Sequence, residues 1–134
     1  MTEILIDTNI LVYACDPAEP EKREKARRLL TRLQAENTGC FSVQCIAEFF
    51  HATRRGSHPI LTVSEASEQA EVFLASFPTF PLTPMVIINA MRAVREHKFA
   101  YYDAQIWACA HLNQVPIIFS EDFSDGQEIE GVRF

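Results

Sequence analysis

The chain has 134 residues and a net charge of -6, with 48% apolar and 22% charged residues. These values are typical of one globular domain and argue against a strongly basic nucleic-acid-binding protein. No apolar run is long enough to span a membrane, and the N-terminus has no signal region. We therefore expect a single domain over residues 1–134, located in the cytoplasm.

Short apolar runs alternate with helical segments along the chain. The runs predict four or five strands, at 4–6, 40–43, 79–82, 116–119 and 131–134. Helices are expected at 9–15, 21–36, 44–55, 66–77, 84–98 and 103–113, and Thr62 with Glu65 predicts a capping box. Strands without polar alternation are typical of a parallel sheet covered on both faces. The predicted fold class is α/β, a three-layer α/β/α sandwich with a central parallel sheet of four to five strands.

Two carboxylates follow predicted strands directly. Asp7 ends the first apolar run, and Asp122 lies in "SEDFSDG" after the fourth. In open parallel sheets, ligands bind beyond the carboxyl ends of the strands. Asp7 and Asp122 are therefore expected at the functional edge of one sheet.

Two further acids stand in apolar helical segments. Glu48 lies within "SVQCIAEFF", and Asp103 lies near the start of "YYDAQIWACAHL". Both are near the N-terminal ends of their helices, which lie at the same edge of an α/β/α sandwich. Four gathered carboxylates repel one another unless a cation neutralises them, and oxygen ligands suit Mg²⁺ or Mn²⁺.

Each acid also has an ordinary structural interpretation. Asp7 and Asp103 fit helix N-caps, Glu48 fits an ion pair with a nearby Arg or Lys, and Asp122 fits a turn. For any single residue, the structural interpretation is at least as good as the functional one. The set of four, drawn from distant parts of the chain, favours a metal site.

The chain resembles the PIN-domain ribonucleases, and in particular the toxins of virulence-associated (VapBC-type) toxin–antitoxin pairs. The resemblance rests on four motifs in order, which together span essentially the whole chain: "ILIDTNILVYA", "SVQCIAEFF", "YYDAQIWACAHL" and "PIIFSEDFSDG".

The resemblance implies a metal-dependent endoribonuclease with an RNA substrate, an antitoxin partner and a homodimeric state. The implied catalytic and Mg²⁺- or Mn²⁺-binding residues are Asp7, Glu48, Asp103 and Asp122, with Asn9 and Ser120 in support. Glu121 and Asp125 remain alternatives to Asp122 as the fourth acid. The alternative function is a catalytically inactive PIN-like protein-interaction module.

Other phosphate-handling classes fit less well. A haloacid-dehalogenase-type phosphotransferase would carry a second Asp where the chain has Asn9. A receiver domain needs an Asp after a middle strand, and no Asp occurs between Asp16 and Asp103. The segment 122–126 lacks the alternating ligands of an EF-hand.

The remaining reactive side chains have ordinary interpretations. The four cysteines have no zinc-site spacing, so we expect buried free thiols. His51 is expected on a helix surface, and Trp107 in the core or in a dimer interface. Basic residues cluster at 22–32, at 54–55 and at Arg92, Arg95 and Lys98, where they either hold phosphates at the rim of the site or form solvated helix faces.

Overall fold

The computed structural model describes residues 3–120 and 126–134. The strands are β1 (Ile4–Ile6), β2 (Gly39–Ser42), β3 (Thr79–Phe80), β4 (Ile117–Phe119), β5 (Glu128–Ile129) and β6 (Val132–Arg133). The helices are α1 (Thr8–Tyr13), α2 (Pro20–Glu36), α3 (Val43–Thr53), α4 (Val63–Ser76), α5 (Pro84–His97) and α6 (Tyr101–Leu112).

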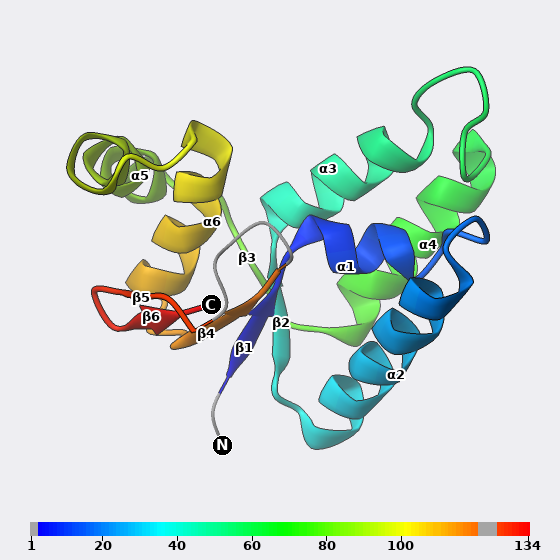
Figure 1. The fold of residues 1–134 in the computed structure, drawn as a ribbon, viewed down its shortest axis with the longest axis horizontal. Helices are drawn as coiled ribbons and strands as arrows, with labels where there is room; N and C mark the ends of the chain where they lie inside the picture. Colours follow the sequence, from blue (N-terminus) through cyan, green and yellow to red (C-terminus); the bar gives the residue numbers. More distant parts are fainter. Residues whose placement is uncertain (1–2, 121–125) are drawn as a thin grey trace.

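One six-stranded sheet lies at the centre of the fold, with the strand order β3-β2-β1-β4-β6-β5. β1 pairs in parallel with both β2 and β4, so its carboxyl end lies in the middle of the sheet edge. Helices α1 to α4 cover one face, and α5 and α6 cover the other (Figure 1). The predicted α/β/α class is confirmed. The sheet has one more strand than expected, because β5 adds an antiparallel edge to β6.

The N-terminal ends of α1 and α6 test the interpretation of Asp7 and Asp103 as helix N-caps. Asp7 is the N-cap of α1, and its side chain accepts a hydrogen bond from the Thr8 amide. Asp103 is not a cap, because α6 begins two residues earlier and Ala100 takes the N-cap position. The predicted capping box of Thr62 and Glu65 is present at the start of α4.

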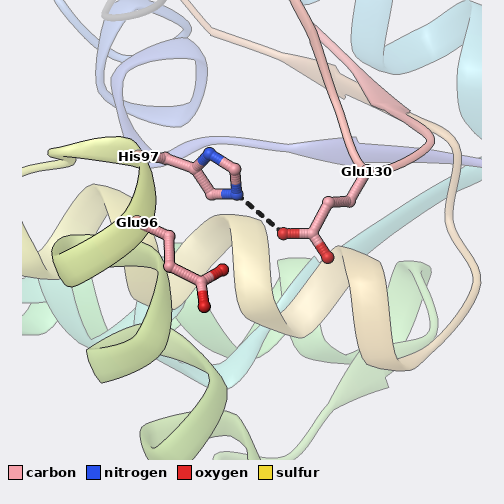
Figure 2. A group of neighbouring side chains, drawn as sticks. All are labelled: Glu96, His97 and Glu130. Carbon is pink, nitrogen blue, oxygen red and sulfur yellow. Dashed lines mark hydrogen bonds and ion pairs between the residues drawn. The ribbon is translucent and has the colours of Figure 1, made fainter.

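The β5–β6 turn is tied to α5 by charged side chains. Glu130, in the turn, accepts hydrogen bonds from both terminal nitrogens of Arg92, at 2.8 and 3.1 Å. His97 Nε2 lies 2.7 Å from the same carboxylate (Figure 2). These contacts attach the edge of the sheet to the α5–α6 layer.

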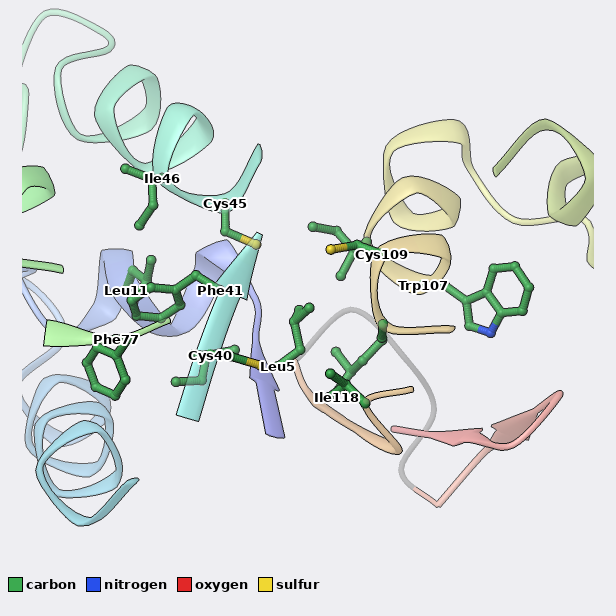
Figure 3. Close-up of a cluster of buried hydrophobic side chains, with 14 of the residues drawn as sticks. Leu5, Leu11, Cys40, Phe41, Cys45, Ile46, Phe77, Trp107, Cys109 and Ile118 are labelled. Atoms are coloured by element: carbon green, nitrogen blue, oxygen red, sulfur yellow. The ribbon is translucent and has the colours of Figure 1, made fainter. Parts of the chain in front are cut away.

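Apolar side chains fill the space on both sides of the sheet (Figure 3). Leu5, Phe41 and Ile118 are fully buried. Trp107 is also fully buried, and its indole N–H donates to the Ile129 carbonyl at 3.1 Å. Of the two positions expected for Trp107, the structure shows the core.

The cysteines are free, as expected; three of them are buried and Cys15 is half-buried. In the described part of the chain, no helix combines the length and the apolar character needed to cross a bilayer.

Candidate active site

Asp7 lies at the carboxyl end of β1, at the centre of the sheet edge. Its side chain is 4% exposed. The Thr8 amide donates to Asp7 Oδ1 at 2.7 Å, and the Ser120 hydroxyl donates to Oδ2 at 2.6 Å. The Asp7 amide in turn donates to the Phe119 carbonyl at 3.0 Å. The carboxylate is thus fixed by the ends of β1 and β4.

Glu48 reaches the same place from the second turn of α3. The Thr8 hydroxyl donates to Glu48 Oε2 at 2.8 Å, so Thr8 bonds to both Asp7 and Glu48. The Gln44 amide donates to Glu48 Oε1 at 2.8 Å. Within the described residues, no Arg or Lys pairs with Glu48, and Arg54 instead lies over the Phe50 ring. The ion-pair interpretation of Glu48 is therefore wrong for this part of the chain.

Asp103 lies in the first turn of α6, where the helix dipole favours an acidic side chain. The Gln44 side chain connects this turn to Glu48, because its amide also donates to the Tyr102 carbonyl at 3.2 Å. Gln105 Nε2 donates to Gln44 Oε1 at 2.7 Å. The connected hydrogen bonds thus run from Asp7 through Thr8, Glu48 and Gln44 to the turn that carries Asp103.

Sequence reasoning missed both glutamines. Gln105 stands in the apolar segment "AQIWACA", and an isolated polar residue in such a segment is the same signal that identified Glu48 and Asp103. Gln44 gave a weaker signal, since a polar residue in the first turn of a helix is common on protein surfaces.

The oxygen-rich surroundings of Asp7 fit a hard cation. Asn9 Nδ2 lies 3.3 Å from the Ser120 hydroxyl, while Asn9 Oδ1 is buried and has no hydrogen-bond partner among the described residues. An unpaired buried carbonyl oxygen beside a buried carboxylate is an acceptor that Mg²⁺ or Mn²⁺ would satisfy. Asp122, like its alternatives Glu121 and Asp125, lies outside the described residues.

The negative charge at this edge affects the pKa of Cys45. Burial, followed by the charge of Asp7, raises the pKa of the Cys45 thiol to about 12. The thiol is therefore neutral at physiological pH and does not offer a thiolate ligand. The ligands that this edge offers are oxygen atoms.

A different group of side chains has the closest spacing. Among the described residues, Glu96, His97 and Glu130 form the one group of three whose candidate ligand atoms all lie within 4.8 Å of one another. Arg92 already bonds to both carboxylates of that group, at 2.9 Å from Glu96 and 2.8 Å from Glu130. We therefore assign this group to stabilisation of the β5–β6 turn.

A groove of about 830 Å³ opens beside Thr8 and Glu48. His51 lines it from α3, Arg55 from the segment that follows this helix, and Tyr102 from α6. Tyr102 is 65% exposed. The expected surface position of His51 is confirmed, and that surface is the wall of this groove.

Solved structures similar to this chain are toxins and toxin–antitoxin complexes. A toxin–antitoxin complex from Klebsiella pneumoniae matches with a TM-score of 0.70 and 19% identity, over 98% of this chain and 97% of that one. The Mycobacterium tuberculosis toxin VapC20, described as cleaving the sarcin–ricin loop, matches with a TM-score of 0.71 and 19% identity, over 98% and 99%. VapBC2 from Rickettsia felis, bound to a promoter DNA fragment, matches with a TM-score of 0.69 and 15% identity, over 90% and 88%.

At these identities, the likeness establishes the fold alone. Comparison with curated proteins gives no match. The family model of the PIN domain, however, matches residues 4–124, which include Asp7, Glu48, Asp103 and Asp122. The match covers most of the chain and agrees with the parallel sheet and its acidic edge. The chain belongs to the PIN domain family.

Proposed function

We propose that this protein is a metal-dependent endoribonuclease and the toxin of a toxin–antitoxin pair. The observation that carries the proposal is the connected set of hydrogen bonds at the carboxyl edge of the sheet. Through Thr8 and Gln44, it ties Asp7 and Glu48 to the first turn of α6, where Asp103 lies. A fold that needed these acids only for solubility would have no reason to bury Asp7 and to hydrogen-bond both Asp7 and Glu48 in this way.

The proposed site residues are Asp7, Glu48, Asp103 and Asp122, which would hold the Mg²⁺ or Mn²⁺. When bound, the metal would offset the charge of the phosphodiester and lower the pKa of a coordinated water. Thr8 and Ser120 would keep the Asp7 carboxylate oriented, and Asn9 would add its carbonyl oxygen, which has no hydrogen-bond partner among the described residues. No histidine is required as a general base.

The groove beside Glu48 is the proposed path of the RNA. Arg55 follows the end of α3 and lines the same groove as Glu48, so it would meet the RNA backbone away from the scissile phosphate. The exposed ring of Tyr102 offers a stacking surface for a base. A chain with a net charge of -6 needs such a local cation to hold an anionic polymer.

The proposal includes two protein partners, an antitoxin and a second copy of the chain. The similar structures from Klebsiella pneumoniae and Rickettsia felis, both described as toxin–antitoxin assemblies, support the first. Exposed apolar residues along α5, namely Met85, Ile88 and Met91, support a protein contact on that helix. Light scattering of the purified chain and co-purification with the product of a neighbouring gene would test the two partners separately.

Cleavage assays on single-stranded RNA test the enzymatic proposal. Cleavage should require Mg²⁺ or Mn²⁺, stop with EDTA, and leave a 5′-phosphate and a 3′-hydroxyl. Asp7→Asn, Glu48→Gln and Asp103→Asn should each lose most of the activity with unchanged circular dichroism. Asp122→Asn, compared with Glu121→Gln and Asp125→Asn, identifies the fourth acid.

Two results would contradict the proposal. Wild-type cleavage by a folded Asp7→Asn variant would remove the metal site from the mechanism. Stable binding of a partner, with no RNA cleavage in any divalent metal, would favour the inactive interaction module instead.

A further inference from the structure

Two buried glutamines, Gln44 and Gln105, lie beside the candidate active site but have no role in the chemistry proposed above. Their exposed fractions are 8% and 5%. Burying an amide is unfavourable unless hydrogen bonds satisfy it. Gln105 Nε2 donates to Gln44 Oε1 at 2.7 Å, and Gln44 Nε2 donates to Glu48 Oε1 and to the Tyr102 carbonyl, at 2.8 and 3.2 Å.

The surrounding groups determine how the two amides are oriented. A carboxylate and a backbone carbonyl only accept hydrogen bonds, so the Gln44 atom between Glu48 and Tyr102 has to be the donor nitrogen. The Gln44 oxygen then points the other way, where it needs a donor, and Gln105 supplies it. Gln105 thus prevents the Gln44 amide from turning its oxygen towards Glu48.

We infer that Gln44, held in place by Gln105, is a positioning residue that fixes the Glu48 carboxylate for the metal ion. The inference rests on the proposed function of this site. Gln44 and Glu48 are four residues apart on α3, so their side chains lie on the same face of the helix. Thr8 bonds to the other Glu48 oxygen. One hydrogen bond to each oxygen leaves further lone pairs to coordinate a cation.

The pair also links two of the elements that carry the acids. Gln44 belongs to α3, whereas Tyr102 and Gln105 stand on either side of Asp103 in α6. Thr8 holds the Asp7 and Glu48 carboxylates close together, so their repulsion favours a rotation of Glu48 away from Asp7. The hydrogen bond from Gln44 opposes that rotation, so the Glu48 ligand is in place before the metal arrives.

Calorimetric titration of the full chain with Mn²⁺, in the absence of RNA, tests the inference. Gln44→Met keeps an unbranched side chain of similar length but removes the donor, and it should weaken Mn²⁺ binding by about 10–100-fold. Gln105→Met should weaken binding less, since it only releases the Gln44 amide. The double variant should bind like Gln44→Met alone, because Gln105 acts through Gln44. Gln69→Met, on α4, is the matched control and should bind like the wild type.

Wild-type affinity in Gln44→Met would overturn the inference, and so would losses that add up in the double variant. A merely structural role would lower the melting temperature of these variants and leave their Mn²⁺ affinity unchanged. If Gln44→Met failed to fold, Gln105→Met would supply the same titration. A wild type that binds Mn²⁺ but cleaves no RNA would contradict the proposed function while leaving the positioning role standing.

Discussion

Asp7 affects the stability of the folded state in two opposite ways. As the N-cap of α1, it stabilises the first turn of that helix. As a buried carboxylate that shares Thr8 with Glu48, it adds repulsion to the folded state. Substitutions at this single position can separate the two effects.

In EDTA, Asp7→Asn should raise the melting temperature by a few degrees. Asn keeps an oxygen that can accept the Thr8 amide, while the negative charge is removed. Asp7→Ala removes the same charge and also the cap, whose loss costs about 1 kcal/mol, so it should melt about 3–5 °C below Asp7→Asn. Scanning calorimetry of the wild type and both variants measures the two differences. An Asp7→Asn variant that melts at or below the wild-type temperature would mean that charge repulsion at this edge is negligible.

Arg55 belongs to the groove, so its substitution should affect binding of RNA more than the chemical step. Arg55→Gln should raise KM several-fold, leave kcat within about twofold, and reduce the salt dependence of binding. Arg95→Gln, on α5 and away from the groove lining, is the charge-matched control. A loss of the same size in both variants would point to a general effect of net charge, and the proposed RNA path would be wrong.

The candidate acids could be proposed from the sequence because each stands in an apolar segment or directly after a strand. The side chains that hydrogen-bond to these acids could not be predicted. Thr8 looks like an ordinary helix-start residue, and Gln44 meets Gln105 only when residues 61 positions apart pack together. Contacts between distant residues leave no periodic signal in a single sequence.

At the scale of elements, the apolar strands and the capped helices follow from local sequence. The β5 strand does not, because it is two residues long and its sequence carries Glu128. Tertiary contacts form it, namely the bonds from Arg92 to Glu130 and from the Trp107 indole to Ile129. The sequence also predicted the start of α6 two residues too late. Ala100 caps this helix without a side-chain hydrogen bond, so no capping residue marks the start in the sequence.

The charged contacts of Glu130 make the attachment of this turn sensitive to pH. Hydrogen bonds from Arg92, and then from His97, lower the pKa of Glu130 from 4.5 to about 2. A carboxyl whose pKa is lower in the folded state stabilises the fold above its unfolded pKa. That stabilisation is lost as the pH falls from about 4.5 towards 2.

Glu130→Gln should therefore lower the melting temperature at pH 7 by a few degrees. Solvent exposure limits the loss to about 1 kcal/mol. The gap between variant and wild type should narrow when both are melted at progressively lower pH. Glu128→Gln, in the same hairpin, is the control and should change little. A gap that stays constant down to pH 3 would show that the ion pairs are not its cause.

At the scale of the whole molecule, the order of the strands explains how the segments that carry the candidate acids reach one edge of the sheet. β1 lies between β2 and β4, so Asp7 follows a central strand, and the chain after β2 enters α3 directly. The crossover through α5 and α6 brings Asp103 back before β4 begins. Four distant segments therefore converge at one edge, and a ligand bound there would be linked to folding of the entire domain.

Mg²⁺ should accordingly raise the melting temperature of the wild type, because it binds the folded form and has little affinity for the unfolded chain. At a concentration one hundred times the dissociation constant, such binding adds about 2.7 kcal/mol to the free energy of unfolding. With roughly 3–5 °C per kcal/mol, this corresponds to a shift of about 10 °C.

The net charge of -6 requires a control, since any salt screens the repulsion within an acidic chain. NaCl at matched ionic strength should therefore produce a smaller rise than Mg²⁺. The Asp7→Asn/Asp103→Asn double variant should respond to both salts alike, because screening remains but the specific ligands are lost. Calorimetry of the wild type and the double variant, each with Mg²⁺ and with NaCl, measures the four melting temperatures. If NaCl raised the wild-type melting temperature as much as Mg²⁺ does, the cation would act only by screening, and this edge of the sheet would not be a metal site.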